Sequence, residues 1–186
     1  MKKLLACLAT VLVSTSAMAG TRPFNLSLTP DIAIYDRSET IEGLTLSVWG
    51  ENPQTSLALG IANGATGKSA GLSVGILNYA DNYKGLEWGL VNYAKDDFAG
   101  WQGGFLLGVV GSAVNYTGGT MKGFQAGVVN YAGTLTGLQL GLVNYAEAAD
   151  AGVQIGLVNI IRQNTSWFTE LPEQLAPAMI FVNWRF

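Results

Sequence analysis

The sequence predicts an all-β protein, an antiparallel meander that closes into a small transmembrane β-barrel of about ten strands. Three observations favour this fold class. A glycine-rich unit related to Gly-Leu-x-x-Gly-Leu-Val-Asn recurs along most of the chain, its residues alternate between apolar and small or polar types, and the chain ends in an apolar, aromatic segment. A β-solenoid, in which the same units wind as coils, is the alternative prediction.

Residues 1–19 are predicted to be a secretory signal peptide. Two lysines precede an apolar run from Leu4 to Val13, and Ala17-Met18-Ala19 is a cleavage site of the A-x-A type. The run is shorter than the roughly 20 apolar residues that a membrane-spanning helix needs. Residues 20–186 are then expected to form a single barrel domain built from strand–turn repeats of 13 to 15 residues.

The composition of the exported part limits its chemistry. Without the leader the chain holds 8 basic and 13 acidic residues and no cysteine, so it offers no basic surface for nucleic acid. Charged residues are 12% of the whole chain and glycines number 24 in 186, against about 25% and 7% in average proteins. Weak charge and abundant glycine, without a helical span, are typical of a membrane β-barrel or a β-solenoid.

The repeat can be aligned on its first and eighth positions. Most neighbouring units start 13 to 15 residues apart, and the exception is a half-unit that starts at Gly108, soon after the unit at Gly100. Such regular spacing is a signal at the level of the whole fold. The first positions are Gly43, Ser56, Gly71, Gly85, Gly100, Gly108, Gly123, Gly137 and Gly152, and the asparagines at position eight are Asn63, Asn78, Asn92, Asn115, Asn130, Asn144 and Asn159.

Strand alternation gives the repeat two different faces. In the unit that starts at Gly137, the even positions Leu138, Leu140, Leu142 and Asn144 share one face, and the odd positions are small or polar apart from a valine and a tyrosine. A barrel would turn the leucines to lipid and the polar row to its interior. The residues predicted to line that lumen are Glu87, Gln102, Gln125, Gln139 and Gln154.

The strands are expected in the following order, joined by short turns rich in turn formers. An even number of strands suits a bacterial barrel, although 100–116 could hold two strands and make the total eleven or twelve. The expected strands are 24–33, 41–50, 55–63, 70–79, 84–93, 100–116, 122–131, 136–145, 151–160 and 178–186. Tyrosines at their ends are placed where interface aromatics belong.

The C-terminal segment carries the most specific sign of a barrel. Ile180, Val182, Trp184 and Phe186 share one face of the last predicted strand, and the chain ends on the aromatic residue. This pattern resembles the terminal-strand signal by which outer-membrane barrels are recognised for assembly. It therefore predicts contact with the barrel-assembly machinery during biogenesis.

Three parts of the exported sequence carry a resemblance to known proteins. They are Gly123–Asn130, the two units at Gly137 and Gly152, and the ending Phe181–Phe186. Together they resemble a family of small exported proteins of Gram-negative bacteria with Gly-x-Gln-x-Gly-Leu-Val-Asn surface repeats. The resemblance implies residence at the surface or in the outer membrane and brings no catalytic residues. The units at Gly43 and Gly100 depart from the pattern because they lack the asparagine.

The residues offer little for catalysis. The chain has no histidine, which excludes Ser-His-Asp and Cys-His catalysis and histidine-ligated metals. Asp96 and Asp97 lie in a predicted turn without the ligand spacing of a calcium loop. No catalytic, cofactor-binding or metal site is predicted. Glu87, an inward carboxylate in a barrel, is interpreted as part of a packed interior rather than of a cation path.

The sequence thus predicts a protein of a Gram-negative outer membrane with a structural, adhesive or minor transport role. It is not expected to be an enzyme, and its expected partners are outer-membrane lipid and the assembly machinery. The alternative is a soluble exported β-solenoid that acts as a binding scaffold. In that alternative the asparagines at position eight would stack as a hydrogen-bonded ladder.

Overall fold

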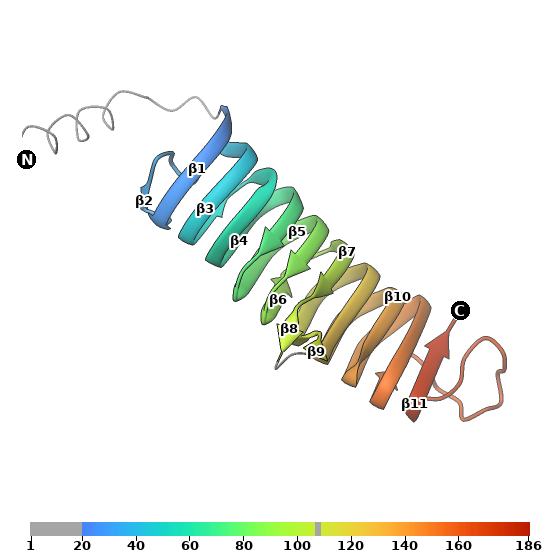
Figure 1. The fold of residues 1–186 in the computed structure, drawn as a ribbon. Coiled ribbons are helices and arrows are strands. Elements are labelled where there is room, and N and C mark those ends of the chain that lie inside the picture. The colour runs from blue at the N-terminus through green and yellow to red at the C-terminus, as the bar shows by residue number, and fades with distance from the viewer. Residues whose placement is uncertain (1–19, 107–108) are drawn as a thin grey trace, which may run out of the picture.

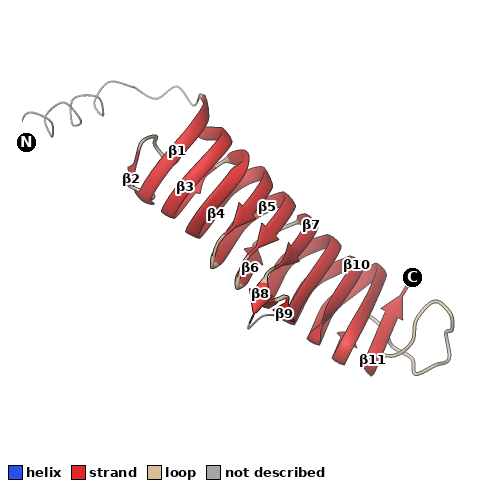
Figure 2. Cartoon of the chain, viewed as in Figure 1, coloured by secondary structure: helices blue, strands red, loops and turns tan. Residues whose placement is uncertain are grey.

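The chain winds as a β-solenoid. The computed structural model describes residues 20–106 and 109–186, and its repeats wind as successive coils along one axis (Figure 1). Strands dominate throughout, and the described residues include no helix long and apolar enough to cross a membrane (Figure 2). The all-β prediction is confirmed, the barrel is wrong, and the solenoid alternative is the fold observed. The predicted signal peptide, 1–19, lies outside the described residues.

The strands vary widely in length because several coils merge into one continuous strand. The bounds are β1 Thr21–Thr29, β2 Ile32–Ala33, β3 Thr40–Asn52, β4 Gln54–Val74, β5 Leu77–Trp88, β6 Val91–Ala94, β7 Phe98–Gly103, β8 Phe105–Leu106, β9 Val109–Val110, β10 Ser112–Ile161 and β11 Ala178–Arg185. The longest, β10, has 50 residues and contains several whole coils.

Neighbouring coils pair in parallel and in register, which overturns the antiparallel meander. Gly71 of β4 pairs with Gly85 of β5, and Gly85 pairs with Gly100 of β7. Likewise, Asn78 of β5 pairs with Asn92 of β6. Parallel stacking places each repeat position beside its own copy in the next coil. In a meander, alternate strands run in opposite directions, and identical residues would not meet.

Each coil consists of two strand segments joined by two bends. After β5, the chain bends at Gly89–Leu90, continues as β6, and bends again at Lys95–Asp97 before β7. The first bend falls at repeat positions five and six. The two segments therefore form two layers that face each other, with a narrow interior between them.

Glycine at position five makes the first bend possible. A Cβ atom added at Gly141 would lie 2.6 Å from Nδ2 of Asn130, whose side chain fills the inside of the bend. Glycine at position one has a different reason. Gly137 has a φ of +134°, which residues with a side chain rarely adopt. Glycine at these two positions, as at Gly137 and Gly141, is thus required by backbone conformation and close packing.

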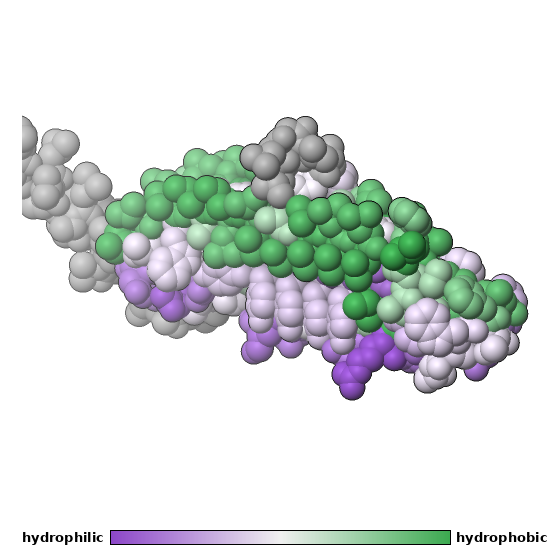
Figure 3. Space-filling model, turned by 90° about the horizontal axis from the view of Figure 1, so that it is seen from below, coloured by the Kyte–Doolittle hydropathy of each residue, from purple (hydrophilic) through white to green (hydrophobic). Residues whose placement is uncertain are grey.

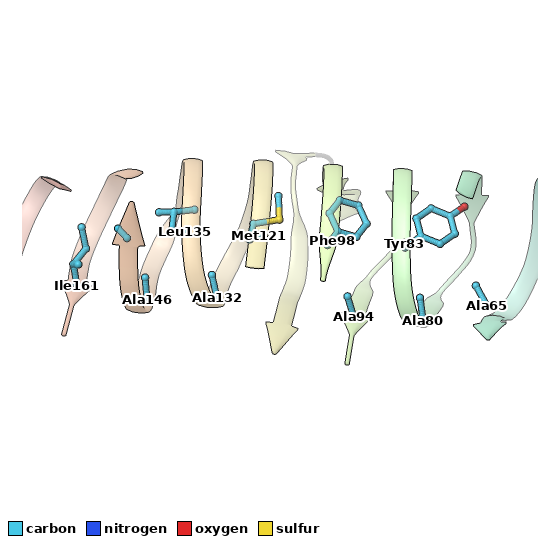
Figure 4. Packing of buried hydrophobic residues seen from close by; sticks show 11 residues of the cluster. Ala65, Ala80, Tyr83, Ala94, Phe98, Met121, Ala132, Leu135, Ala146 and Ile161 are labelled. Atoms are coloured by element: carbon cyan, nitrogen blue, oxygen red, sulfur yellow. The ribbon is translucent and has the colours of Figure 1, made fainter. Parts of the chain in front are cut away.

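A narrow apolar core lies beside the second bend (Figure 4). Large side chains form one column in the first layer, and alanines form the facing column in the second. Because each large residue faces a small one, the two layers approach closely. The core therefore has the dense packing typical of protein interiors. The large residues are Tyr83, Phe98, Met121 and Leu135, and the alanines include Ala65, Ala80, Ala94, Ala132 and Ala146.

Both ends of the solenoid are capped by antiparallel strands. At the N-terminal end β2 pairs antiparallel with β1, and at the C-terminal end β11 pairs antiparallel with the last coil of β10. The segment before β11 folds over this end, where Asn164 Nδ2 donates to the Ala176 carbonyl at 2.9 Å. Caps of this kind cover strand edges that would otherwise pair with other chains.

The predicted assembly signal lies in this C-terminal cap. Ile180 and Phe186 are exposed, Val182 pairs with Ile155, and Trp184 Nε1 donates to the Pro172 carbonyl at 2.8 Å. The strand closes a solenoid and is not the last strand of a barrel. Val182 and Trp184 are thus held in the cap, whereas Ile180 and Phe186 remain on its surface.

One coil contains an insertion, where the sequence was expected to hold a half-unit. Gly100 pairs with Gly123, a spacing of 23 residues instead of the usual 14 or 15. The extra residues form the short antiparallel hairpin of β8 and β9, in which Phe105 pairs with Val110. The predicted strand 100–116 is thus divided among β7, the hairpin and the start of β10, and Gly108 lies outside the described residues.

The caps predict the assembly state of a truncated chain. Removing residues 178–186 would leave the last coil of β10 with an unpaired edge, and we expect such chains to associate end to end. Analytical ultracentrifugation should show larger species for the truncated chain than for the full one. If the truncated chain stays folded and sediments as a single monomer, β11 is not needed as a cap.

Candidate functional site

The inside of the first bend is occupied by a ladder of asparagine side chains. Each Nδ2 atom donates to the Oδ1 atom of the asparagine in the next coil, at 2.8 to 3.0 Å. Asn130 also donates to the Leu140 carbonyl at 3.0 Å, which ties the side chain to the neighbouring coil. The members are Asn63, Asn78, Asn92, Asn115, Asn130, Asn144 and Asn159.

A second ladder runs parallel to the first at repeat position three. Gln154 donates to Gln139, Gln139 to Gln125, and Gln125 to Gln102, each at 2.8 Å. Gln102 then donates to Oε2 of Glu87 at 2.9 Å. The residues predicted to line a lumen therefore lie together in one buried row. There is no lumen for them to line, because the two layers close on this row.

Glu87 begins the glutamine ladder and differs from its other members in being ionisable. Its side chain is 1% exposed, and burial raises its pKa to about 8, against the opposing effect of the hydrogen bond from Gln102. The preceding coil carries Ser73 at the same position, and its hydroxyl donates to Asn78. The carboxyl group is thus enclosed and held in its neutral form at neutral pH.

The outside of the first bend is apolar along the whole solenoid (Figure 3). We call this surface the apolar edge and define it as the outward side chains at repeat positions two, four, six and seven. Position six lies at the bend and is the most exposed column, with Ile76 and Leu157 each 56% exposed. Other exposed members are Leu57, Leu59, Ile61, Leu72, Leu77, Leu90, Val114, Val129, Leu140, Leu142, Val143, Ile155 and Val158.

The sequence predicted apolar columns but placed two positions on the wrong face. Asn144 lies inside although strict alternation grouped it with the leucines, and Val143 points outward beside Leu142. The bend at this point puts two consecutive side chains outside. The sequence does contain a signal for this bend. Two adjacent apolar residues, Leu142 and Val143, are followed by an asparagine, which breaks the alternation of the strand.

The size of the apolar edge separates it from ordinary surface hydrophobicity. Neighbouring coils lie about 4.8 Å apart, and a strand rises about 3.3 Å per residue. Over the coils that carry the asparagine ladder, the apolar edge therefore has an area on the order of 500 Å². Few soluble monomers expose a continuous apolar patch of this size without a binding role. The edge is therefore the first candidate for a functional surface.

A column of stacked tyrosines borders the apolar edge at position nine. The rings of Tyr116 and Tyr131 lie 4.7 Å apart and nearly parallel, and Tyr93 and Tyr145 extend the stack on either side. Tyr79 precedes them in register and bonds to Trp49 and Glu51. Such rings present an apolar face and a polar hydroxyl at the same border.

A shallow groove of about 470 Å³ lies on the outside of the other layer, next to the second bend. Lys84 and Lys122 lie in one outward column, separated by Ala99, and Lys68 lies in the adjacent column. Asn82 and Asp97 also line the groove. The lysines thus lie close to the carboxylates of the second bend, because Asn82 of the groove donates to Oδ2 of Asp96 at 3.3 Å.

Neither metal chemistry nor a known relative identifies a further site. Within residues 20–106 and 109–186, no three acidic, histidine or cysteine side chains gather as metal ligands do. The chain matches no model of a protein family, no curated protein and no solved structure. The resemblance to exported surface-repeat proteins remains a prediction, and the apolar edge stands on its geometry alone.

The asparagine ladder predicts a large loss of stability at an inward position. Asn130→Ala would remove the bonds from Asn115 and to Asn144, leaving both neighbours with buried unpaired groups. We expect a loss of roughly 2 to 4 kcal/mol in the free energy of unfolding, measured by urea titration. The adjacent outward variant Val129→Ala should lose about 0.5 kcal/mol. Equal losses for both variants would contradict the role of the ladder.

The environment of Glu87 predicts a loss of stability as pH rises. Its pKa is raised from 4.5 to about 8 in the folded chain, so between these values unfolding releases a proton and higher pH favours unfolding. The free energy of unfolding should fall by up to about 5 kcal/mol across this window. Glu87→Gln should flatten that dependence, while the exposed control Glu42→Gln should keep it. A wild-type chain equally stable at pH 5 and pH 8.5 would contradict the assignment.

Proposed function

We propose that this protein is an exported, non-catalytic binding scaffold that uses its apolar edge as the contact surface. The observation that carries the proposal is the continuity of exposed apolar columns from coil to coil. Leu26 of β1 lies at one end of the edge, and Ile180 of β11 lies at the other. The edge therefore runs through both caps as well as through the repeats.

The fold itself does not need an apolar exterior at these positions. Its interior is made from amide ladders and a core of alanines and larger residues, all of them inward. Side chains such as Leu142, 52% exposed, contribute little buried area to that interior. Threonine would suit an exposed strand position equally well. Apolar residues at every coil are thus better explained by a contact made with something outside the chain.

Export is supported by the sequence of the leader and by the residues that follow it. The backbone nitrogen of Gly20 donates to Oε2 of Glu39 at 2.9 Å, and Arg22 Nε bonds the same oxygen at 3.2 Å. Cleavage after Ala19 would turn that nitrogen into an ammonium group next to a mostly buried carboxylate. The new N-terminus would therefore gain an ion pair.

The absence of catalysis is proposed from the residues available. The sequence has no histidine, and its only cysteine, Cys7, lies in the leader. Glu87, the carboxyl group with the largest rise in pKa, is enclosed in the glutamine ladder and is out of reach of a substrate. Asp96 and Asp97 are exposed at the second bend, where their oxygens cap neighbouring backbone and side-chain groups.

Site-specific photocrosslinking in an exporting Gram-negative host tests the proposal. A benzophenone amino acid at Leu142 or Ile76 should give adducts with a partner, whether protein or lipid. The same probe at Lys95 or Asp150, both exposed near the second bend, should give few. N-terminal sequencing of the recovered chain should begin at Gly20. Adducts that form equally from both surfaces, or from neither, would contradict a scaffold that binds through the apolar edge.

A further inference from the structure

We propose that the occupant of the apolar edge is the surface of a lipid bilayer, into which the edge inserts with the solenoid axis parallel to the membrane. This inference rests on the proposed function and names its partner. It differs from the predicted barrel because no strand crosses the membrane. Four features of the structure favour lipid over a second copy of the chain or another protein.

The first feature is the wedge shape of the edge. Positions two and four lie on the outside of one layer, position seven lies on the outside of the other, and position six lies at the bend between them. Ile61 and Leu142 at the bend are 55% and 52% exposed, whereas Leu72 and Val143 on the flanks are 38% and 36% exposed. A flat sheet from a second copy would cover one flank and leave the other in water. A fluid bilayer surrounds both flanks.

The second feature is the hairpin of β8 and β9. It leaves the coil at Gly104 and returns at Gly111, whose backbone nitrogen donates to the Gly104 carbonyl at 2.6 Å. Gly104 lies over Gly89 in the glycine column of the bend, so the hairpin leaves the coil at the first bend, where the apolar edge lies. A hairpin at this place interrupts any flat protein surface laid along the edge. Lipid can deform around it.

The third feature is the lack of polar anchors within the edge. Protein interfaces carry about one hydrogen bond per 100–200 Å², made by polar groups spread among the apolar ones. In the described residues, positions two, four, six and seven carry aliphatic residues, tryptophan, phenylalanine, alanine and glycine. Among the tryptophans of the edge, Trp49 Nε1 donates to the hydroxyl of Tyr79 at 2.8 Å, and Trp101 Nε1 is buried. Such a surface provides affinity for hydrocarbon and little specificity for a protein.

The fourth feature is the pair of borders on either side of the edge. The tyrosine column lies three residues from the bend, about 10 Å along the strand, which matches the depth of about 5–10 Å reached by interfacial helices. Tyrosine belts at this depth place their rings in the interfacial region and their hydroxyls in water. On the other layer Lys84 and Lys122 can extend their ammonium groups to lipid phosphates.

The charges of the second bend complete the orientation. Acidic residues gather there beside Lys95, on the side of the solenoid opposite the apolar edge, as the polar side of Figure 3 shows, and Asp96, Asp97 and Asp150 are exposed. In the proposed orientation they face water and stay away from the negative surface of the membrane. They are Asp81, Asp96, Asp97, Glu147 and Asp150.

Vesicle flotation of the full chain, purified from an exporting host, tests the inference directly. The vesicles contain phosphatidylethanolamine and phosphatidylglycerol. The wild-type chain should float with them, and the variant I61T/I76T/L142T/L157T should bind at least tenfold less while keeping its circular dichroism spectrum. The matched control K95T/D96T/D150T, altered at the second bend, should float like the wild type.

A reporter at the edge separates lipid from the other occupants. Cysteine variants L142C and D150C are labelled with an environment-sensitive fluorophore, since the chain has no cysteine beyond Cys7. Vesicles should shift the emission to the blue at position 142 and leave it unchanged at position 150. If position 142 responds to protein concentration without vesicles and the mass doubles, the occupant is a second copy and the inference falls. If photocrosslinking from the edge yields protein adducts and no flotation occurs, the inference falls while the scaffold function stands.

Discussion

The rest of the structure depends on one interaction, the hydrogen bond from each asparagine side chain to the asparagine of the next coil. Asn144, for example, accepts from Asn130 at 2.8 Å and donates to Asn159 at 2.8 Å, inside the bend that defines the coil. Each such bond satisfies a buried amide only if the coils stack in parallel and in register. A slip of one residue would leave buried polar groups unpaired along the whole ladder. The ladder therefore specifies pairing direction, register and the position of the bend together.

The exterior follows from the same constraint. Because the asparagine points inward, the two residues before it both point outward, and the first of them belongs to the most exposed column of the edge. Repeating them gives a continuous apolar edge, and repeating position nine gives a tyrosine column beside it. The glutamine ladder at position three is built in the same way, from hydrogen bonds between the side-chain amides of neighbouring coils. It differs only at its first member. There Glu87 replaces an amide by a carboxyl group, and burial raises its pKa to about 8, so this end of the glutamine ladder is sensitive to pH.

The sequence was sufficient to predict strands, the two faces of the repeat and the inward glutamines. It did not determine the fold class, because strand alternation is the same in a barrel and in a solenoid. The apolar row was assigned to barrel lipid, and Ile180 and Phe186 were assigned to a terminal barrel strand. What decides between the folds is the identity of Asn130, Asn144 and their copies. Only parallel neighbours bring identical amides together, whereas barrel strands need only matching polarity. The hairpin of β8 and β9 could not be predicted, since its glycine-rich, apolar sequence continues the repeat.

The central claim is the parallel stacking of the coils, and a series of spin-label distances tests it most directly. One label at position 158 is paired in turn with labels at positions 91, 77 and 62, all at repeat position seven in the described chain. Pulsed electron paramagnetic resonance should give separations that increase by about 4.8 Å with each coil, reaching about 29 Å for the last pair. Distances that level off or shorten along the series, as they would around a closed barrel, would contradict the solenoid and the apolar edge derived from it.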